Sequence, residues 1–126
     1  MTTTAPAVHD GIWSSMEHYR DALVAAGIRA TVDPGRVDPP CVLIVPETGE
    51  FNVMCDGDAH TEWVLWVLGG QPGRVDTMRA LSRTVAGVLQ TLQISGRAEW
   101  TTYRTDDGDA WPACRLSFET VSSWIR

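Results

Sequence analysis

The sequence predicts an α+β fold, a single domain in which two helices pack with a mixed or antiparallel sheet of five to six strands. A chain of 126 residues, 44% of them hydrophobic, suits one core that needs neither disulfides nor a metal. Two segments carry apolar residues at spacings of three and four, which indicates amphipathic helices. The other apolar segments either alternate with polar residues or are continuously apolar, as strands are. The predicted order of elements is α-β-β-β-β-α-β-β.

Two helices are expected within a domain that spans residues 10–126, behind a disordered or extended tail at residues 1–9. The first begins after Asp10, a good N-cap, and ends at Gly27. The second follows the glycine-rich connector at residues 69–73, and Gly96 closes it. The apolar stripes are Ile12, Met16, Tyr19, Leu23 and Ala26 in the first helix, and Val75, Met78, Leu81, Val85, Val88, Leu89 and Leu92 in the second, opposite Arg74, Arg79 and Arg83.

Strands joined by turns fill the rest of the domain. Residues 28–32 alternate as a short strand does, and Asp33-Pro34-Gly35 then turns the chain. Residues 41–45 are apolar at every position, so both faces of this strand should be covered in the middle of the sheet, with Pro46 as its end. The predicted hairpins join residues 51–55 to 61–68 around Asp56-Gly57-Asp58, and residues 98–102 to 114–118 around residues 106–109.

Composition excludes several classes of function. Ten basic residues against sixteen acidic ones give a net charge of -6, which offers no positive field for DNA or for anionic lipid. No signal peptide is apparent, and the longest apolar run, residues 63–68, is too short to span a bilayer. We therefore expect the protein to act in the cytosol or in an assembly made there.

Candidate chemistry is sparse. Cys55 and His60 lie close in sequence, and with Cys41 and Cys114 they outline a possible metal site or thiol nucleophile. Each cysteine, however, stands in a strand pattern as a small hydrophobe would, and no C-x-x-C pair is present, which favours buried free thiols in a reducing compartment. We predict no enzyme activity, no metal and no cofactor.

Tryptophan is abundant, with six residues in the chain. Trp63 and Trp66 have opposite parity in one strand, so they should point to opposite faces of the sheet. The second apolar face then needs a helix of its own or a neighbouring subunit to cover it. Trp63, Trp66, Trp111 and Trp124 are the candidate interface residues.

The segment Asp33-Pro34, followed by Pro39-Pro40 and the apolar residues 41–45, resembles the N-terminal half of tail terminator proteins of long-tailed, siphovirus-type bacteriophages, especially those of actinobacterial hosts. The resemblance extends over most of residues 10–121. It implies a non-enzymatic virion protein, assembled in the host cytoplasm, that forms a ring, usually a homohexamer, at the head-proximal end of the tail tube. Such a ring stops polymerisation of the major tail protein and joins the tail to the head-completion proteins of the neck.

Double-stranded DNA would pass through this ring without specific binding, which a negatively charged lumen favours. Seven carboxylates lie in three predicted loop tips and are the candidate lumen residues: Glu47, Glu50, Asp56, Asp58, Asp106, Asp107 and Asp109. The alternatives are a head-to-tail adaptor or stopper of the same neck, a small cytosolic ligand-binding domain with a tryptophan-lined pocket, and a thiol enzyme that uses Cys55 and His60.

Overall fold

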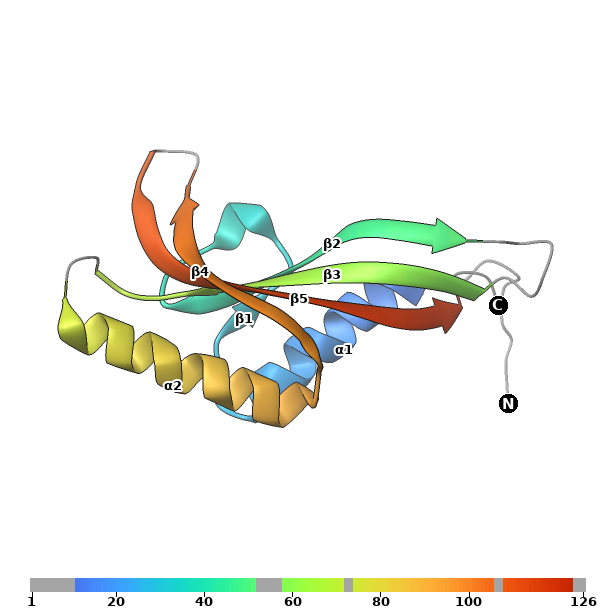
Figure 1. Ribbon diagram of the computed structural model, residues 1–126, viewed down its shortest axis with the longest axis horizontal. Helices are drawn as coiled ribbons and strands as arrows, with labels where there is room; N and C mark the ends of the chain where they lie inside the picture. The colour runs from blue at the N-terminus through green and yellow to red at the C-terminus, as the bar shows by residue number, and fades with distance from the viewer. Residues whose placement is uncertain (1–10, 52–57, 72–73, 106–107, 124–126) are drawn as a thin grey trace.

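A computed structural model describes residues 11–51, 58–71, 74–105 and 108–123. The predicted α+β class is confirmed: two helices accompany one five-stranded mixed sheet (Figure 1). In chain order the elements are α1 (Gly11–Ala25), β1 (Ala30–Thr31), the 3-10 turn η1 (Pro34–Arg36), β2 (Cys41–Phe51), β3 (Asp58–Leu68), α2 (Val75–Leu92), β4 (Gly96–Arg104) and β5 (Ala110–Ser123).

The strands lie in the order β1-β2-β3-β5-β4, with β1 parallel to β2 and every other pair antiparallel. Both predicted hairpins are present, as β2–β3 and β4–β5. The two strands expected at residues 41–45 and 51–55 are instead one strand, β2, as far as the described residues reach. Pro46 does not end it, because the pairing with β3 shifts between Pro46 and Thr48 in a bulge. β1 pairs only with Val42 and Leu43, so β2 runs along the edge of the sheet at the proline, where a missing N–H is tolerated.

α1 buries Met16 and Leu23 of the predicted stripe. Gly27 adopts φ +83, and the next amide, that of Ile28, donates to the Leu23 carbonyl at 2.9 Å, which closes the helix where the sequence predicted. The predicted N-cap, Asp10, lies outside the described residues.

α2 ends earlier than predicted. Gln93 takes the left-handed conformation, with φ 54, and its N–H donates to the Leu89 carbonyl at 2.9 Å. Gly96 is the first residue of β4 rather than a helix stop. Of the predicted stripe, Leu81 and the two valines at 85 and 88 are buried.

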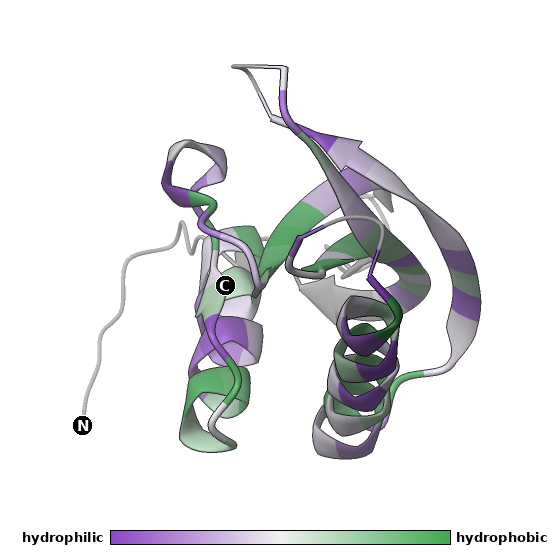
Figure 2. Cartoon of the chain, turned by 90° about the vertical axis from the view of Figure 1, so that its left-hand side faces the viewer, coloured by the Kyte–Doolittle hydropathy of each residue, from purple (hydrophilic) through white to green (hydrophobic). Residues whose placement is uncertain are grey.

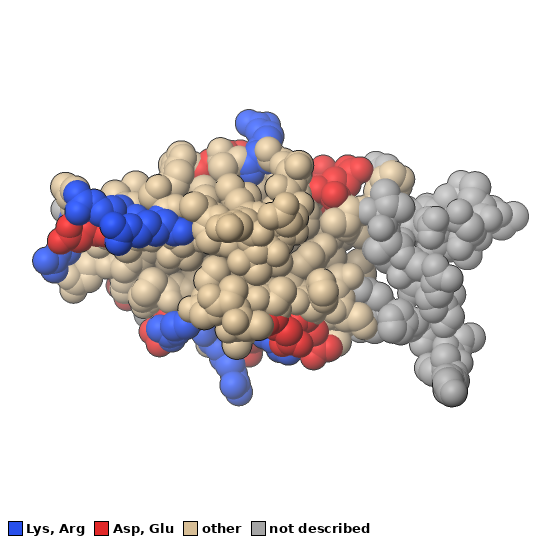
Figure 3. All heavy atoms as spheres, turned by 90° about the horizontal axis from the view of Figure 1, so that it is seen from below, with Lys and Arg blue, Asp and Glu red and all other residues tan. Residues whose placement is uncertain are grey.

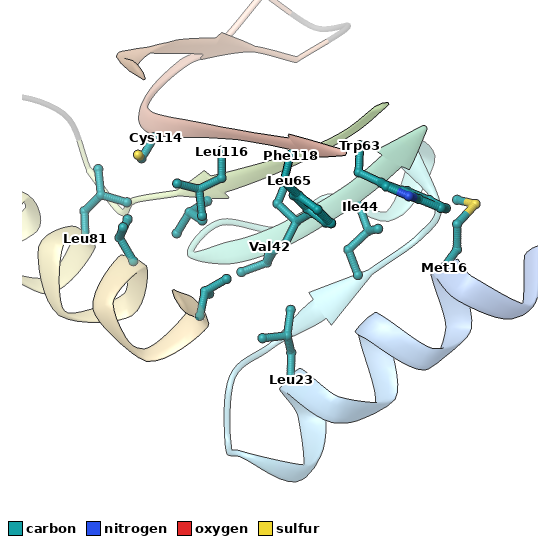
Figure 4. Close-up of a cluster of buried hydrophobic side chains, with 13 residues drawn as sticks. Met16, Leu23, Val42, Ile44, Trp63, Leu65, Leu81, Cys114, Leu116 and Phe118 are labelled. Atoms are coloured by element: carbon teal, nitrogen blue, oxygen red, sulfur yellow. The ribbon is translucent and has the colours of Figure 1, made fainter. Parts of the chain in front are cut away.

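Both helices pack on one face of the sheet and enclose the main core (Figure 4). Hydrophobic residues concentrate in the middle of the sheet, whereas α2 and the outer strand carry hydrophilic bands (Figure 2). The buried core residues are Met16, Leu23, Val42, Ile44, Trp63, Leu65, Val67, Leu81, Val85, Val88, Cys114, Leu116 and Phe118.

The other face of the sheet carries a second, smaller cluster around Cys41, Leu43 and Leu68. Neither helix covers it. The β4–β5 hairpin curves away from the helices (Figure 1) and brings Tyr103 and Trp111 onto this cluster. No helix of the described residues covers this face, because a long twisted hairpin folds back on its own sheet. Cover of the rest of the face by a neighbouring subunit stays a prediction.

Candidate functional site

The tryptophans of β3 point to opposite faces of the sheet, as their parity predicted. Trp63 is fully buried on the helix side, where its ring reaches Met16 (Figure 4). Its indole N–H donates to Oγ1 of Thr120 at 2.8 Å, and the ring of Tyr19 packs edge-on at 5.4 Å. Trp63 therefore belongs to the core and presents no surface to another subunit.

Trp66 and Trp111 lie on the helix-free face and are half-buried. The ring of Tyr103 contacts Trp66 edge-on at a centroid distance of 5.2 Å, and the Arg115 guanidinium lies 5.9 Å above the Trp66 ring. The Nε1 atom of Trp111 is buried without a hydrogen-bond partner within the described residues. Trp124, the fourth interface candidate, lies outside them.

Sequence reasoning missed the most exposed tryptophan of the described chain. Trp100 lies on the outer strand β4 with 55% of its surface exposed. It stands directly opposite Cys114 of β5, whose side chain belongs to the main core, so Trp100 is on the helix side of the sheet. The alternation of residues 98–102 predicted that Trp100 lies on a strand. The sequence did not predict the order of the strands, which places β4 at the edge of the sheet.

The first of the three predicted acidic tips is not a loop. Residues 47–50 are part of β2, so Glu47 and Glu50 stand on a strand. Asp58, which the sequence placed in a turn at residues 56–58, is instead the first residue of β3. Asp109 does lie in the β4–β5 turn, where its carbonyl accepts from the Thr105 N–H at 2.9 Å. Asp56, Asp106 and Asp107 lie outside the described residues.

Glu47 belongs to a group of charged side chains that the sequence did not indicate. It forms an ion pair with Arg115 of β5, which also lies 3.9 Å from Glu99 of β4. Glu62 of β3 stands directly opposite Glu119 of β5. We call Glu47, Glu62 and Glu119 the acidic patch.

The acidic patch borders a hollow of about 410 Å³ on the helix-free face, together with Arg97, Arg115 and Ser117. These residues come from four strands, so only strand pairing brings them together. Like charges that face each other across a ladder, as Glu62 and Glu119 do, repel.

The described cysteines are packing residues. Cys41 and Cys114 are buried free thiols, and burial raises the pKa of both, which favours the neutral thiol over the reactive thiolate. His60 Nδ1 lies 3.1 Å from a carboxylate oxygen of Glu119. Cys55 lies outside the described residues, and so does any pairing of it with His60.

The described part of the chain holds no group of three side chains placed to bind a metal ion. None of its helices is long and apolar enough to cross a membrane. The features that remain are surfaces: the acidic patch on one face and the exposed side chains of α2 and β4 on the other. Comparison with known protein families finds no match, and comparison with curated proteins finds no similar sequence.

Proposed function

We propose that this protein is a bacteriophage tail terminator, a virion protein that forms a ring at the head-proximal end of the tail tube. The observation that carries the proposal is the order of elements around the proline-rich segment. α1, β1, the proline turn, β2, the β2–β3 hairpin, α2 and the β4–β5 hairpin follow one another as the resemblance implies. In this role the chain binds further copies of itself, the major tail tube protein and the stopper or adaptor proteins of the neck.

The two sides of the sheet support such a role. A ring that joins a tube to a neck needs two unlike faces, and head-to-tail contacts around a rotation axis leave those faces free while they close the ring. In this molecule the two sides of the sheet are unlike, a layer of two helices on one and a helix-free surface with the acidic patch on the other, so they can meet head-to-tail between neighbouring copies and leave the remaining surfaces for the two ring faces.

The charge balance also supports the proposal. At a net charge of -6 the chain repels DNA on balance, so a genome can move through a channel made of it without being held. A basic lumen would bind phosphates and oppose that movement.

A test of the proposal combines imaging with a polymerisation assay. In a reconstruction of the neck of virions that carry this chain, we expect a ring of it on the last turn of the tube. Added to the major tail protein of the same virion, the purified chain should halt tube growth. A stopper or adaptor would leave tube length unchanged and bind the portal side, and a neck without a ring of this chain would refute the proposal.

A further inference from the structure

The helix side of the molecule carries large apolar side chains that the fold leaves in solvent. Val75, Met78 and Leu89 of α2 are 75%, 46% and 39% exposed, and Trp100 of β4 is 55% exposed. Single exposed apolar residues are ordinary, whereas a contiguous group of them marks an interaction site. We call these four residues the α2–β4 surface.

These residues lie on one open side of α2 and β4. Met78 and Leu89 are eleven residues apart, about three helical turns, so they lie on one side of α2. Leu89 and Ala98 line the same groove of about 330 Å³ between α2 and the start of β4. Trp100 is on the same face of β4 as Ala98, two residues further along the strand. α2 packs on β3, β5 and α1, so β4 lies beyond the helix and its helix-side face stays open.

The charges around this surface are opposite in sign to those of the chain as a whole. α2 and its N-cap, residues 74–92, have Arg74, Arg79 and Arg83 against Asp76 as the single acid, a net charge of +2, while the remaining residues carry seven arginines and fifteen acids, a net charge of -8. Seen from the helix side, a broad uncharged area has its largest group of basic side chains at one end (Figure 3).

We propose that the α2–β4 surface binds a second copy of this chain head-to-tail, against that copy's acidic patch. Two α2–β4 surfaces facing each other would bring arginines together, which opposes a symmetric contact. The acidic patch supplies the opposite charge, because its three glutamates outnumber the two arginines of the same hollow. A contact between two unlike surfaces repeats from copy to copy and closes into a ring. The inference rests on the proposed function, since it names the contact between ring neighbours.

Charge reversal on each side of the contact tests the inference. One variant carries Arg79→Glu and Arg83→Glu, and the other carries Glu62→Arg and Glu119→Arg; all four residues are exposed, so the fold should tolerate the changes. In sedimentation velocity at low salt we expect concentration-dependent association of the wild type and an association weakened about tenfold or more in each variant alone, because like charges then meet. An equimolar mixture of the two variants should regain association, because each copy then meets a surface of opposite charge.

Met78→Asp tests the apolar part of the surface, with Val24→Asp as its control. Val24 is equally an exposed apolar residue of a helix, at 55%, but it lies on α1 outside both surfaces. The first change should weaken association about tenfold and the second should leave it unchanged. Circular dichroism spectra that match the wild type would show that each variant is folded.

Three outcomes would overturn the inference: a wild type that stays monomeric up to about 1 mM, variants that associate like the wild type, or a mixture that associates no better than its components. The proposed function is judged separately. If the chain forms a ring at the tail end but the mixed variants do not regain association, the proposed function stands and this contact is refuted. If the mixed variants regain association but the neck holds no ring of this chain, the contact stands and the proposed function is refuted.

Discussion

At the scale of single residues, the buried polar groups of the core are matched to each other. Thr120 accepts a hydrogen bond from the Trp63 indole N–H, and its side chain is also hydrogen-bonded to Tyr19. Burial raises the pKa of the Tyr19 phenol, and this hydrogen bond opposes the rise. One threonine therefore orients two aromatic rings, one on the sheet and one on α1.

Thr120→Val should destabilise the protein by about 1–3 kcal/mol, because the indole N–H of Trp63 stays buried without its acceptor. The measurement is the free energy of unfolding from urea titration followed by tryptophan fluorescence. Thr101→Val is the matched control, since Thr101 is exposed on β4. Equal effects of the two substitutions would show that the hydrogen bond contributes nothing specific.

Cys41 and Cys114 should resist thiol reagents in the folded protein. Burial raises their pKa above the ordinary value of 9.0, so at pH 8 few thiolates form and fewer are accessible. In a Cys55→Ser background we expect modification at least about tenfold slower than in urea. Rapid reaction of both thiols in the native state would contradict their placement in the core.

At the scale of elements, the start of β4 depends on a residue without a side chain. A Cβ atom on Gly96 would lie 1.9 Å from the carbonyl oxygen of Ser117 on β5, so backbone would have to move to admit it. Gly96 pairs with Phe118, a residue of the main core. The glycine thus lets β4 approach β5 closely as the chain leaves α2.

Gly96→Ala should therefore cost about 2–3 kcal/mol of unfolding free energy, at the upper end of overpacking effects, through displacement of β4 from β5. Gly70→Ala is the control, because a Cβ there meets nothing within 4 Å. Denaturant titration measures both. A Gly96→Ala variant as stable as the control would show that the ladder starts later than Gly96.

The position of β3 in the sheet predicts the pattern of amide hydrogen exchange. β3 is paired on both sides, by β2 and β5, and its residues 63–65 and 67–68 are buried, whereas β4 is an edge strand with almost every residue exposed. The slowest amides should lie in β3 and the fastest sheet amides in β4. Nuclear magnetic resonance exchange on the dilute protein checks this order, and a β4 as protected as β3 would contradict it.

At the scale of the whole molecule, charge is distributed unevenly and the proposed ring would repeat that distribution around its axis. The acidic lumen stays a prediction for Asp106, Asp107 and Asp109 of the β4–β5 turn. Their replacement by Lys should leave the ring and the tail intact but slow genome ejection in a salt-sensitive manner, because each copy would add phosphate contacts. Single-virion ejection rates at low and high salt are the measurement. The same reversal at Asp33 and Asp38 is the control, and unchanged ejection in the turn variant would exclude this turn from the lumen.

Sequence periodicity by itself determined which segments are helices and which are strands. Spacings of three and four marked α1 and α2, because that pattern follows from the backbone geometry of a helix. Alternation marked β4 and β5, and a continuous apolar run marked the start of β2. It also determined that Trp63 and Trp66 face opposite ways and that α1 stops at Gly27.

Only the tertiary structure decided what lies against each side chain. In the sequence Pro46 predicts the end of a strand, yet β2 continues through Pro46. β2 can do so because no strand pairs with its outer edge at that residue. The acidic patch and Arg115 come from strands up to about 70 residues apart, which pairing brings together and periodicity cannot. Part of the apolar stripe of α2 is buried and part is exposed to solvent. The spacing of apolar residues shows which side of a helix is apolar, but it does not show how much of that side the sheet covers.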